Sequence, residues 1–199
     1  MTSLRNTLES PGSGRDAYLD AARDCILDVG WRRTTLTEVA RRAGVSRMTI
    51  YRAWSDMPQL LGDLMTREWT TLVASAALAD AGAGSVERIV GSALRIVRLL
   101  RENELFVRIV ELDPELLLPY LLSRRGRSQQ AILDLLVARL REGQASGDVR
   151  SGDPEVMARA LLLATHGFVF SAHTMVDDDA SLDEIEGELR VVLERAVRA

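Results

Sequence analysis

The chain has 199 residues, and 47% of them are hydrophobic, which is enough for a packed domain and too much for a disordered protein. The formal net charge is −4, and the single cysteine, Cys25, excludes a disulfide framework within one chain. Strand-rich runs are absent from the sequence, so we expect an all-helical fold.

The charge is unevenly distributed. Residues 1–55 carry nine arginines against six acidic residues, a balance of +3, whereas the remainder carries sixteen against twenty-three, a balance of −7. A basic head on an acidic body is typical of nucleic-acid binding, although this asymmetry is modest. The amino terminus has no hydrophobic signal core, and no apolar run approaches the roughly 20 residues of a bilayer span. We therefore expect a cytoplasmic protein.

The first elements in chain order are a tail and a helix. Residues 1–14 are predicted to form a flexible polar tail; the alternative is an arm whose Arg5 and Arg15 reach a DNA minor groove. A helix is predicted over 15–29, with Cys25 on its apolar stripe. A buried structural thiol is the favoured interpretation of that cysteine, ahead of a redox sensor.

Two short helices joined by a tight turn are predicted over 34–54. Thr35 and Glu38 have the spacing of a capping box, and Gly44 suits the left-handed residue that ends a helix. Ser46 is then positioned to cap a second helix over 47–53. The apolar positions recur at helical spacing and predict an inward face: Leu36, Val39, Ala40, Ala43, Val45, Ile50 and Trp54.

The outward face of the second helix has the chemistry of a DNA groove. Arg47 and Arg52 can bond phosphate or a guanine edge, and Tyr51 and Thr49 add hydroxyl groups. Met48 lies on the same side. Periodicity alone leaves one alternative open, an ordinary helical hairpin with a solvated basic face.

Residues 44–54, Gly-Val-Ser-Arg-Met-Thr-Ile-Tyr-Arg-Ala-Trp, resemble the recognition segment of the tetracycline-repressor-like (TetR) family of transcriptional regulators. The family pattern is roughly Gly-Val-Ser-basic-x-Thr-aliphatic-Tyr-x-x-aromatic, and the resemblance covers about residues 15–61. Relatives usually carry a lysine where this chain has Met57, so one phosphate contact is in doubt. Together with the outward chemistry, the resemblance implies these DNA-binding residues: Thr35, Thr37, Ser46, Arg47, Met48, Thr49, Tyr51 and Arg52.

Six further helices are predicted from apolar spacing, over about 57–78, 86–101, 105–112, 128–143, 153–175 and from 181 to near the end of the chain. Pro119 should kink or break a leucine-rich stretch over 116–122, and Arg124, Arg125 and Arg127 form a local basic cluster. The expected architecture is about nine helices. A three-helix DNA-binding head over 15–61 joins a larger helical bundle over 62–199 for effector binding and dimerisation.

The last two helices are predicted to pair with a second copy of the chain. A row of small residues, Ala160, Ala164, Gly167 and Ser171, would let another helix approach closely. The alternative is that both helices simply complete the core of one subunit. The family resemblance favours the homodimer.

The body is larger than dimerisation requires, and polar or aromatic residues interrupt its apolar helices, as in small-molecule sites. The resemblance implies that an effector binds there, shifts the helix over 57–78 and weakens operator binding. The candidate effector-binding residues are Trp69, Arg98, Phe106, Glu111, Tyr120, His166 and Phe170. Arg98 and Glu111 have an alternative interpretation as an internal ion pair or as surface residues.

No metal site, cofactor or catalytic residue is predicted. His166 and His173 are seven apart, but a buried histidine bonded within the protein is favoured over a metal ligand. The sequence therefore predicts a ligand-responsive regulator, most often a repressor in this family, that binds a palindromic operator as a dimer. The alternatives are a DNA-organising protein without an effector, a protein-interaction module, and a small-molecule-processing enzyme. The enzyme is disfavoured because no nucleophile, base and orienting group stand out in the sequence.

Overall fold

The computed structural model describes residues 11–79 and 84–199. Within these ranges the chain is helical throughout and forms no strand, as the sequence predicted; Val149 and Arg198 make an isolated bridge. The helices are α1 (Pro11–Val29), α2 (Leu36–Arg42), α3 (Arg47–Ala53), α4 (Met57–Ala79), α5 (Ser85–Glu102), α6 (Glu104–Leu112), α7 (Leu118–Leu122), α8 (Arg127–Ser146), α9 (Pro154–Ser171) and α10 (Leu182–Val197). Three 3₁₀ turns accompany them: η1 (Trp31–Arg33), η2 (Pro114–Leu116) and η3 (Ala172–Met175).

Several details differ from the predicted elements. The helix α8 runs three residues beyond its predicted end, to Ser146, and α9 ends at Ser171, where η3 replaces the last predicted turn. The helix α1 begins at Pro11, four residues before the predicted start, so part of the expected tail is helical; residues 1–10 lie outside the described ranges. The extra helix is α7, which begins at Leu118. Pro119 sits in its first turn, where a missing N–H leaves no helical hydrogen bond unmade, so it starts a short helix.

The chain divides into two compact units. The first contains the described residues up to Thr66 together with Arg108–Leu117, and the second contains Arg67–Val107 and Leu118–Ala199. The sequence placed a single boundary at residue 61 and assigned 108–117 to the body. The helices α4 and α6 each contribute residues to both units, so two of the three boundaries fall within helices, and the third lies where α7 begins.

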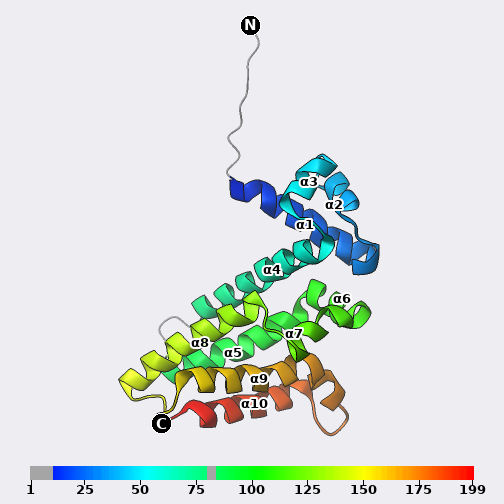
Figure 1. Cartoon of the computed structure of the whole chain (residues 1–199). Coiled ribbons are helices and arrows are strands. Elements are labelled where there is room, and N and C mark those ends of the chain that lie inside the picture. The colour runs from blue at the N-terminus through cyan, green and yellow to red at the C-terminus, as the bar shows by residue number, and fades with distance from the viewer. Residues whose placement is uncertain (1–10, 80–83) are drawn as a thin grey trace. The chain divides into compact units, whose positions relative to one another are not determined.

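The first unit is built on α1, with α2 and α3 packed beside it (Figure 1). Its core is apolar and closed: Ile26, Val39, Ile50, Leu60 and Leu64 are all fully buried. Cys25 is also fully buried and makes no disulfide. Burial raises the pKa of its thiol, which is the behaviour of a structural cysteine.

The second unit is a bundle in which α5 packs against α8, α9 and α10 (Figure 1). Its core side chains come from all four helices, and among them Val90, Leu140, Ala158, Leu189 and Leu193 are almost completely buried. The bundle supplies the scaffold on which the second candidate site is built.

One helix of the bundle has an apolar surface. The segment Pro154–Met175 has the length and the hydropathy, 1.2, of a candidate membrane span, and 28% of it is buried. Arg159 and His166 interrupt this segment, so no apolar run of that length was expected from the sequence. Since α9 packs on α5 and α8 as a bundle helix does, its composition reflects one buried face and one exposed face of small and apolar residues.

Candidate nucleic-acid interface and a pocket in the second unit

The turn between α2 and α3 is fixed by local hydrogen bonds. Thr35 caps α2, since its hydroxyl accepts the N–H of Glu38 at 3.2 Å. Gly44 has φ +66°, and the N–H of Val45 returns to the carbonyl of Ala40 at 3.0 Å. Ser46 then caps α3 by accepting the N–H of Thr49 at 3.2 Å. These three predictions from the sequence are confirmed.

The capping box at α2 is only half formed. The side chain of Glu38 does not return to the backbone of Thr35; its carboxylate accepts bonds from Arg41 at 2.6 Å and from Arg42 at 3.3 Å. These guanidinium groups lower the pKa of Glu38 to about 2. Arg42 also pairs with Asp28 at 2.6 Å, so it bridges α1 and α2.

The helix α3 is anchored by its inner side. Ile50 and Trp54 are buried, and the indole N–H of Trp54 donates to Asp63 of α4 at 2.9 Å. The guanidinium of Arg15 lies 4.7 Å from the Trp54 ring and pairs with Asp63. Both contacts hold Arg15 against α3 and α4 within the first unit. Arg15 is one of the two arginines of the alternative minor-groove arm. Arg5 lies outside the described residues.

The outer side of α3 is open to solvent. Arg47, Met48, Tyr51 and Arg52 are exposed, Met48 by 63% and Tyr51 by 50%. Among the contacts of the described residues, neither Arg47 nor Arg52 pairs with a carboxylate, in contrast to Arg41 and Arg42. The charge of α3 is therefore left for an external anion.

The predicted hydroxyl contacts are already partly engaged. The hydroxyls of Ser46 and Thr49 lie 2.9 Å apart and are hydrogen bonded to each other. Thr35 uses its hydroxyl as a cap, and Thr37 is half-buried. On α3, Arg47, Arg52 and Tyr51 are therefore the exposed side chains whose polar groups have no partner among the described contacts.

A buried carboxylate links the head to a distant segment of the chain. Asp113, only 3% exposed, accepts the backbone N–H of Trp31 at 3.2 Å and lies 3.4 Å from Arg32. Arg32 also pairs with Glu115 at 2.7 Å. This contact explains why residues 108–117 belong to the first unit. No local pattern in the sequence indicates this contact, because the partners are 82 residues apart.

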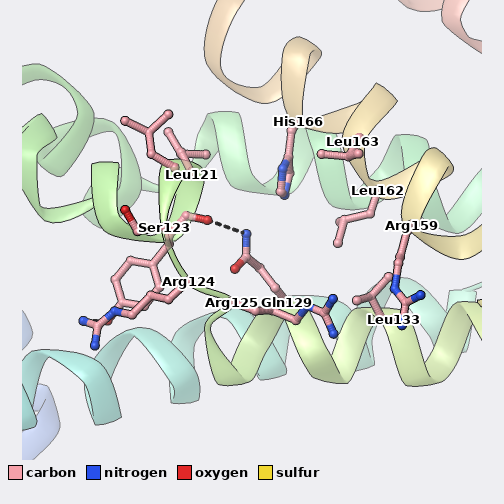
Figure 2. Close-up of a pocket in the computed structure, with 12 residues that line it drawn as sticks. Leu121, Ser123, Arg124, Arg125, Gln129, Leu133, Arg159, Leu162, Leu163 and His166 are labelled. Carbon is pink, nitrogen blue, oxygen red and sulfur yellow. Dashed lines mark hydrogen bonds between the residues drawn. The ribbon is translucent and has the colours of Figure 1, made fainter.

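The second unit contains a pocket of about 350 Å³ beside α7, α8 and α9 (Figure 2). In Figure 2 the side chains of Leu162 and His166 from α9 point toward Gln129 and Leu133 of α8. Gln129 is held in place by a bond from its amide to the carbonyl of Tyr120, at 3.3 Å. The lining residues are Tyr120, Leu121, Leu122, Ser123, Arg124, Arg125, Gln129, Leu133, Arg159, Leu162, Leu163 and His166.

Two of the seven candidate effector residues, Tyr120 and His166, line this pocket. Three others continue from it as a row of aromatic rings. His166 lies against Phe170 at 6.2 Å, Phe170 against Phe106 at 5.5 Å, and Phe106 against Trp69 at 6.1 Å, measured between ring centroids. Burial lowers the pKa of His166, which favours its neutral form.

The remaining two candidates lie elsewhere. Arg98 donates to Glu186 of α10 at 2.5 Å, and Arg101 joins the same carboxylate at 3.3 Å. Glu111 is exposed on the part of α6 that belongs to the first unit. The two residues therefore make neither the ion pair with each other nor a shared site. The structure adds Arg124, Arg125 and Arg159 at the pocket, of which the sequence had marked the first two only as a basic cluster.

Comparison with known proteins agrees with this arrangement. Residues 19–64 match the family described as "Bacterial regulatory proteins, tetR family". The HTH-type transcriptional regulator Rv2250c of Mycobacterium tuberculosis is 38% identical over 173 residues, which cover 86% of this chain and 87% of that protein.

Solved structures share the fold over nearly the whole chain. The transcriptional repressor QsdR of R. erythropolis, from the TetR family, superposes with a TM-score of 0.66 at 18% identity, covering 96% of this chain and 98% of that one. The SmeT–triclosan complex superposes with a TM-score of 0.61 at 22% identity, covering 94% and 92%.

Proposed function

We propose, from the premise that this chain belongs to the tetR family of bacterial regulatory proteins, that it is a ligand-responsive repressor acting in the cytoplasm. It is a transcriptional regulator with a DNA-binding helix-turn-helix. In the proposal, a homodimer binds a palindromic operator and is released when a small-molecule effector binds the second unit.

The observation that carries the proposal is the outer side of α3. Arg47 and Arg52 face solvent without a carboxylate partner among the described contacts, and Tyr51 and Met48 lie beside them. A guanidinium bonds the O6 and N7 atoms of guanine or a phosphate, and apolar atoms can contact the methyl group of thymine. The neighbouring arginines of α2 are paired within the protein, so base reading falls to α3.

Dimer formation is supported by the exposed face of α9. Ala160, Ala164 and Gly167 are exposed, and the apolar side chains of Val156 and Leu163 beside them are 59% and 69% exposed. Small residues on a helix surface allow a second helix to pack closely. A two-fold pair would place two recognition helices about 34–36 Å apart, one turn of DNA, and so double the number of bases read.

The pocket in the second unit supports the response to an effector. Its volume of about 350 Å³ falls in the range of small-molecule sites, about 300–1,000 Å³. The helices α4 and α6 run through both units, and the segment held by Asp113 leads directly into α7 at the pocket. An effector acts through this connection if it binds the operator-free conformation more tightly than the operator-bound one. The coupling free energy between two such sites is usually about 1–3 kcal/mol.

The test is binding to a labelled duplex from upstream of the protein's own gene, beside a scrambled duplex of equal length, over a salt series. We expect selective binding that weakens steeply with salt, because phosphate contacts release counterions. An Arg47→Ala, Tyr51→Ala double variant should lose selective binding. Arg198→Ala, a matched removal of an exposed arginine at the end of α10, should retain it.

Other outcomes separate the alternatives. If binding is selective but no small molecule from a screened set reverses it, the protein is a regulator without the proposed effector response. Equal binding to both duplexes and to further genomic fragments would support a DNA-organising protein. Failure of the folded protein to bind any duplex would refute the proposed operator binding.

A further inference from the structure

The pocket beside α7, α8 and α9 has a marked charge imbalance. Three of its twelve lining residues are arginines, Arg124, Arg125 and Arg159, and none is acidic. The second unit as a whole lies in the acidic part of the chain, so this local excess of positive charge is not inherited from its surroundings.

Two of these arginines contact neutral partners. The guanidinium of Arg124 lies 4.9 Å from the centroid of the Tyr120 ring and donates to the Tyr120 hydroxyl at 3.3 Å. Arg125 donates to the side-chain oxygen of Gln130 at 2.7 Å. These contacts orient the guanidinium groups and leave their charge uncompensated.

Among the described residues, the third arginine shares its counter-ion with another arginine. Arg159 lies 3.8 Å from Glu155, and the same carboxylate is 3.4 Å from Arg141 of α8. Since one carboxylate faces two arginines, this side of the pocket also keeps a net positive charge. The side chain of Arg159 is 51% exposed, so a bound anion can reach its guanidinium.

Apart from the arginines, the pocket is lined by five leucines and by four residues that carry uncharged polar groups. Leu133 is only 4% exposed and forms its base together with the half-buried Leu162. Leu121, Leu122 and Leu163 line the pocket and are 39%, 78% and 69% exposed, so apolar surface extends outward from the base. Burial favours the neutral form of His166, which adds no further charge there.

We propose that the pocket binds an amphipathic anion, with a carboxylate or phosphate head on the arginines and an aliphatic chain over the leucines. The guanidinium fork suits both heads because it donates two parallel hydrogen bonds to either. The claim that this ligand is the effector rests on the proposed function, whereas the claim that it binds this pocket does not.

The experiment is isothermal titration calorimetry of the full chain with four probes of equal chain length: dodecanoate, dodecyl phosphate, dodecanol and dodecyltrimethylammonium, each below its micelle concentration. We expect at least one of the two anions to bind about tenfold or more tightly than the alcohol, and the cation to bind weakest. The two anions together identify the preferred head group. Shortening dodecanoate to decanoate should weaken binding by up to about fourfold per methylene.

Variants locate the site. Arg124→Gln with Arg125→Gln should lower the affinity for the preferred anion about tenfold or more while leaving the affinity for dodecanol unchanged. Arg198→Gln removes one exposed arginine elsewhere and should change neither affinity. A urea unfolding curve for each variant separates loss of binding from loss of folding.

Three results would overturn the proposal: equal affinity for the anions, the alcohol and the cation; an unchanged anion affinity in the double variant; or binding to vesicles of anionic phospholipid without binding to either monomeric anion. Operator release is measured separately. Anion binding without operator release would refute the effector response and leave the ligand assignment standing. Operator release by a cationic or neutral compound bound at this pocket would support the effector response and refute the assignment of an anionic ligand.

Discussion

At the scale of single residues, the arginines of the head divide into paired and unpaired groups. Arg41 and Arg42 are held by Glu38, and Arg42 also by Asp28, whereas the arginines of α3 face solvent. These ion pairs neutralise the positive charge of α2 within the protein. We therefore propose that α3 reads the DNA and that Glu38 has a structural role.

The bonds of Glu38 should make the stability of the head depend on pH. The pKa of Glu38 falls from 4.5 to about 2 on folding. Its contribution to the free energy of unfolding is therefore complete above about pH 4.5 and is lost as the pH falls toward 2. Glu38→Gln should therefore unfold at lower urea concentration than the natural protein at pH 7, and this difference should shrink between pH 4.5 and 2.

Urea midpoints followed by circular dichroism at several pH values measure the effect. Arg41→Gln removes the strongest partner of Glu38 and should reduce the same pH dependence. A difference between Glu38→Gln and the natural protein that stays constant down to pH 2 would contradict this account.

At the scale of elements, the turn between α2 and α3 depends on one backbone conformation. Gly44 has φ +66°, and an added Cβ would meet no atom within 4 Å. The requirement for glycine is therefore conformational and not steric. Gly187, in the middle of α10, also has open space around its Cβ position but lacks a positive φ.

The two glycines make a matched pair for substitution. Gly44→Ala should destabilise the protein by about 1–2 kcal/mol, because a side chain disfavours the left-handed region. Gly187→Ala should stabilise it by about 0.5–1 kcal/mol, since alanine loses less conformational entropy in a helix. Equilibrium urea unfolding distinguishes them, and equal effects of the two substitutions would show that the turn does not require the left-handed residue.

At the scale of the whole molecule, the proposed operator binding requires two copies of the chain. One recognition helix touches too few bases for selective binding, and the exposed small-residue row of α9 is the surface that we propose for pairing. The apolar character of the segment Pro154–Met175 follows if one face packs in the bundle and the other packs on a partner.

A single arginine tests this surface. Ala164→Arg places a bulky charge in the row of α9 and should shift the protein from dimer to monomer in sedimentation velocity, with weaker operator binding. Ala138→Arg makes the same change at an exposed position of α8 and should leave the dimer intact. A monomeric natural protein, or an Ala164→Arg variant that stays dimeric, would exclude pairing through α9.

The sequence by itself determined the helical fold, the caps at Thr35 and Ser46, the turn at Gly44 and the outward side of α3. These features depend on residues a few positions apart, where spacing and side-chain type decide the outcome. Most helix boundaries were also predicted to within one or two residues; the exceptions are the start of α1, the ends of α8 and α9, and the short helix α7.

Only the tertiary structure decided which distant residues meet. It joined Asp113 to Trp31, paired Arg98 with Glu186, and brought Arg159 of α9 to the same pocket as Arg124. Periodicity marks which face of a helix is apolar, but it contains no information on which helix lies opposite. The physical reason is that such contacts depend on how whole helices pack, and no local pattern records that packing.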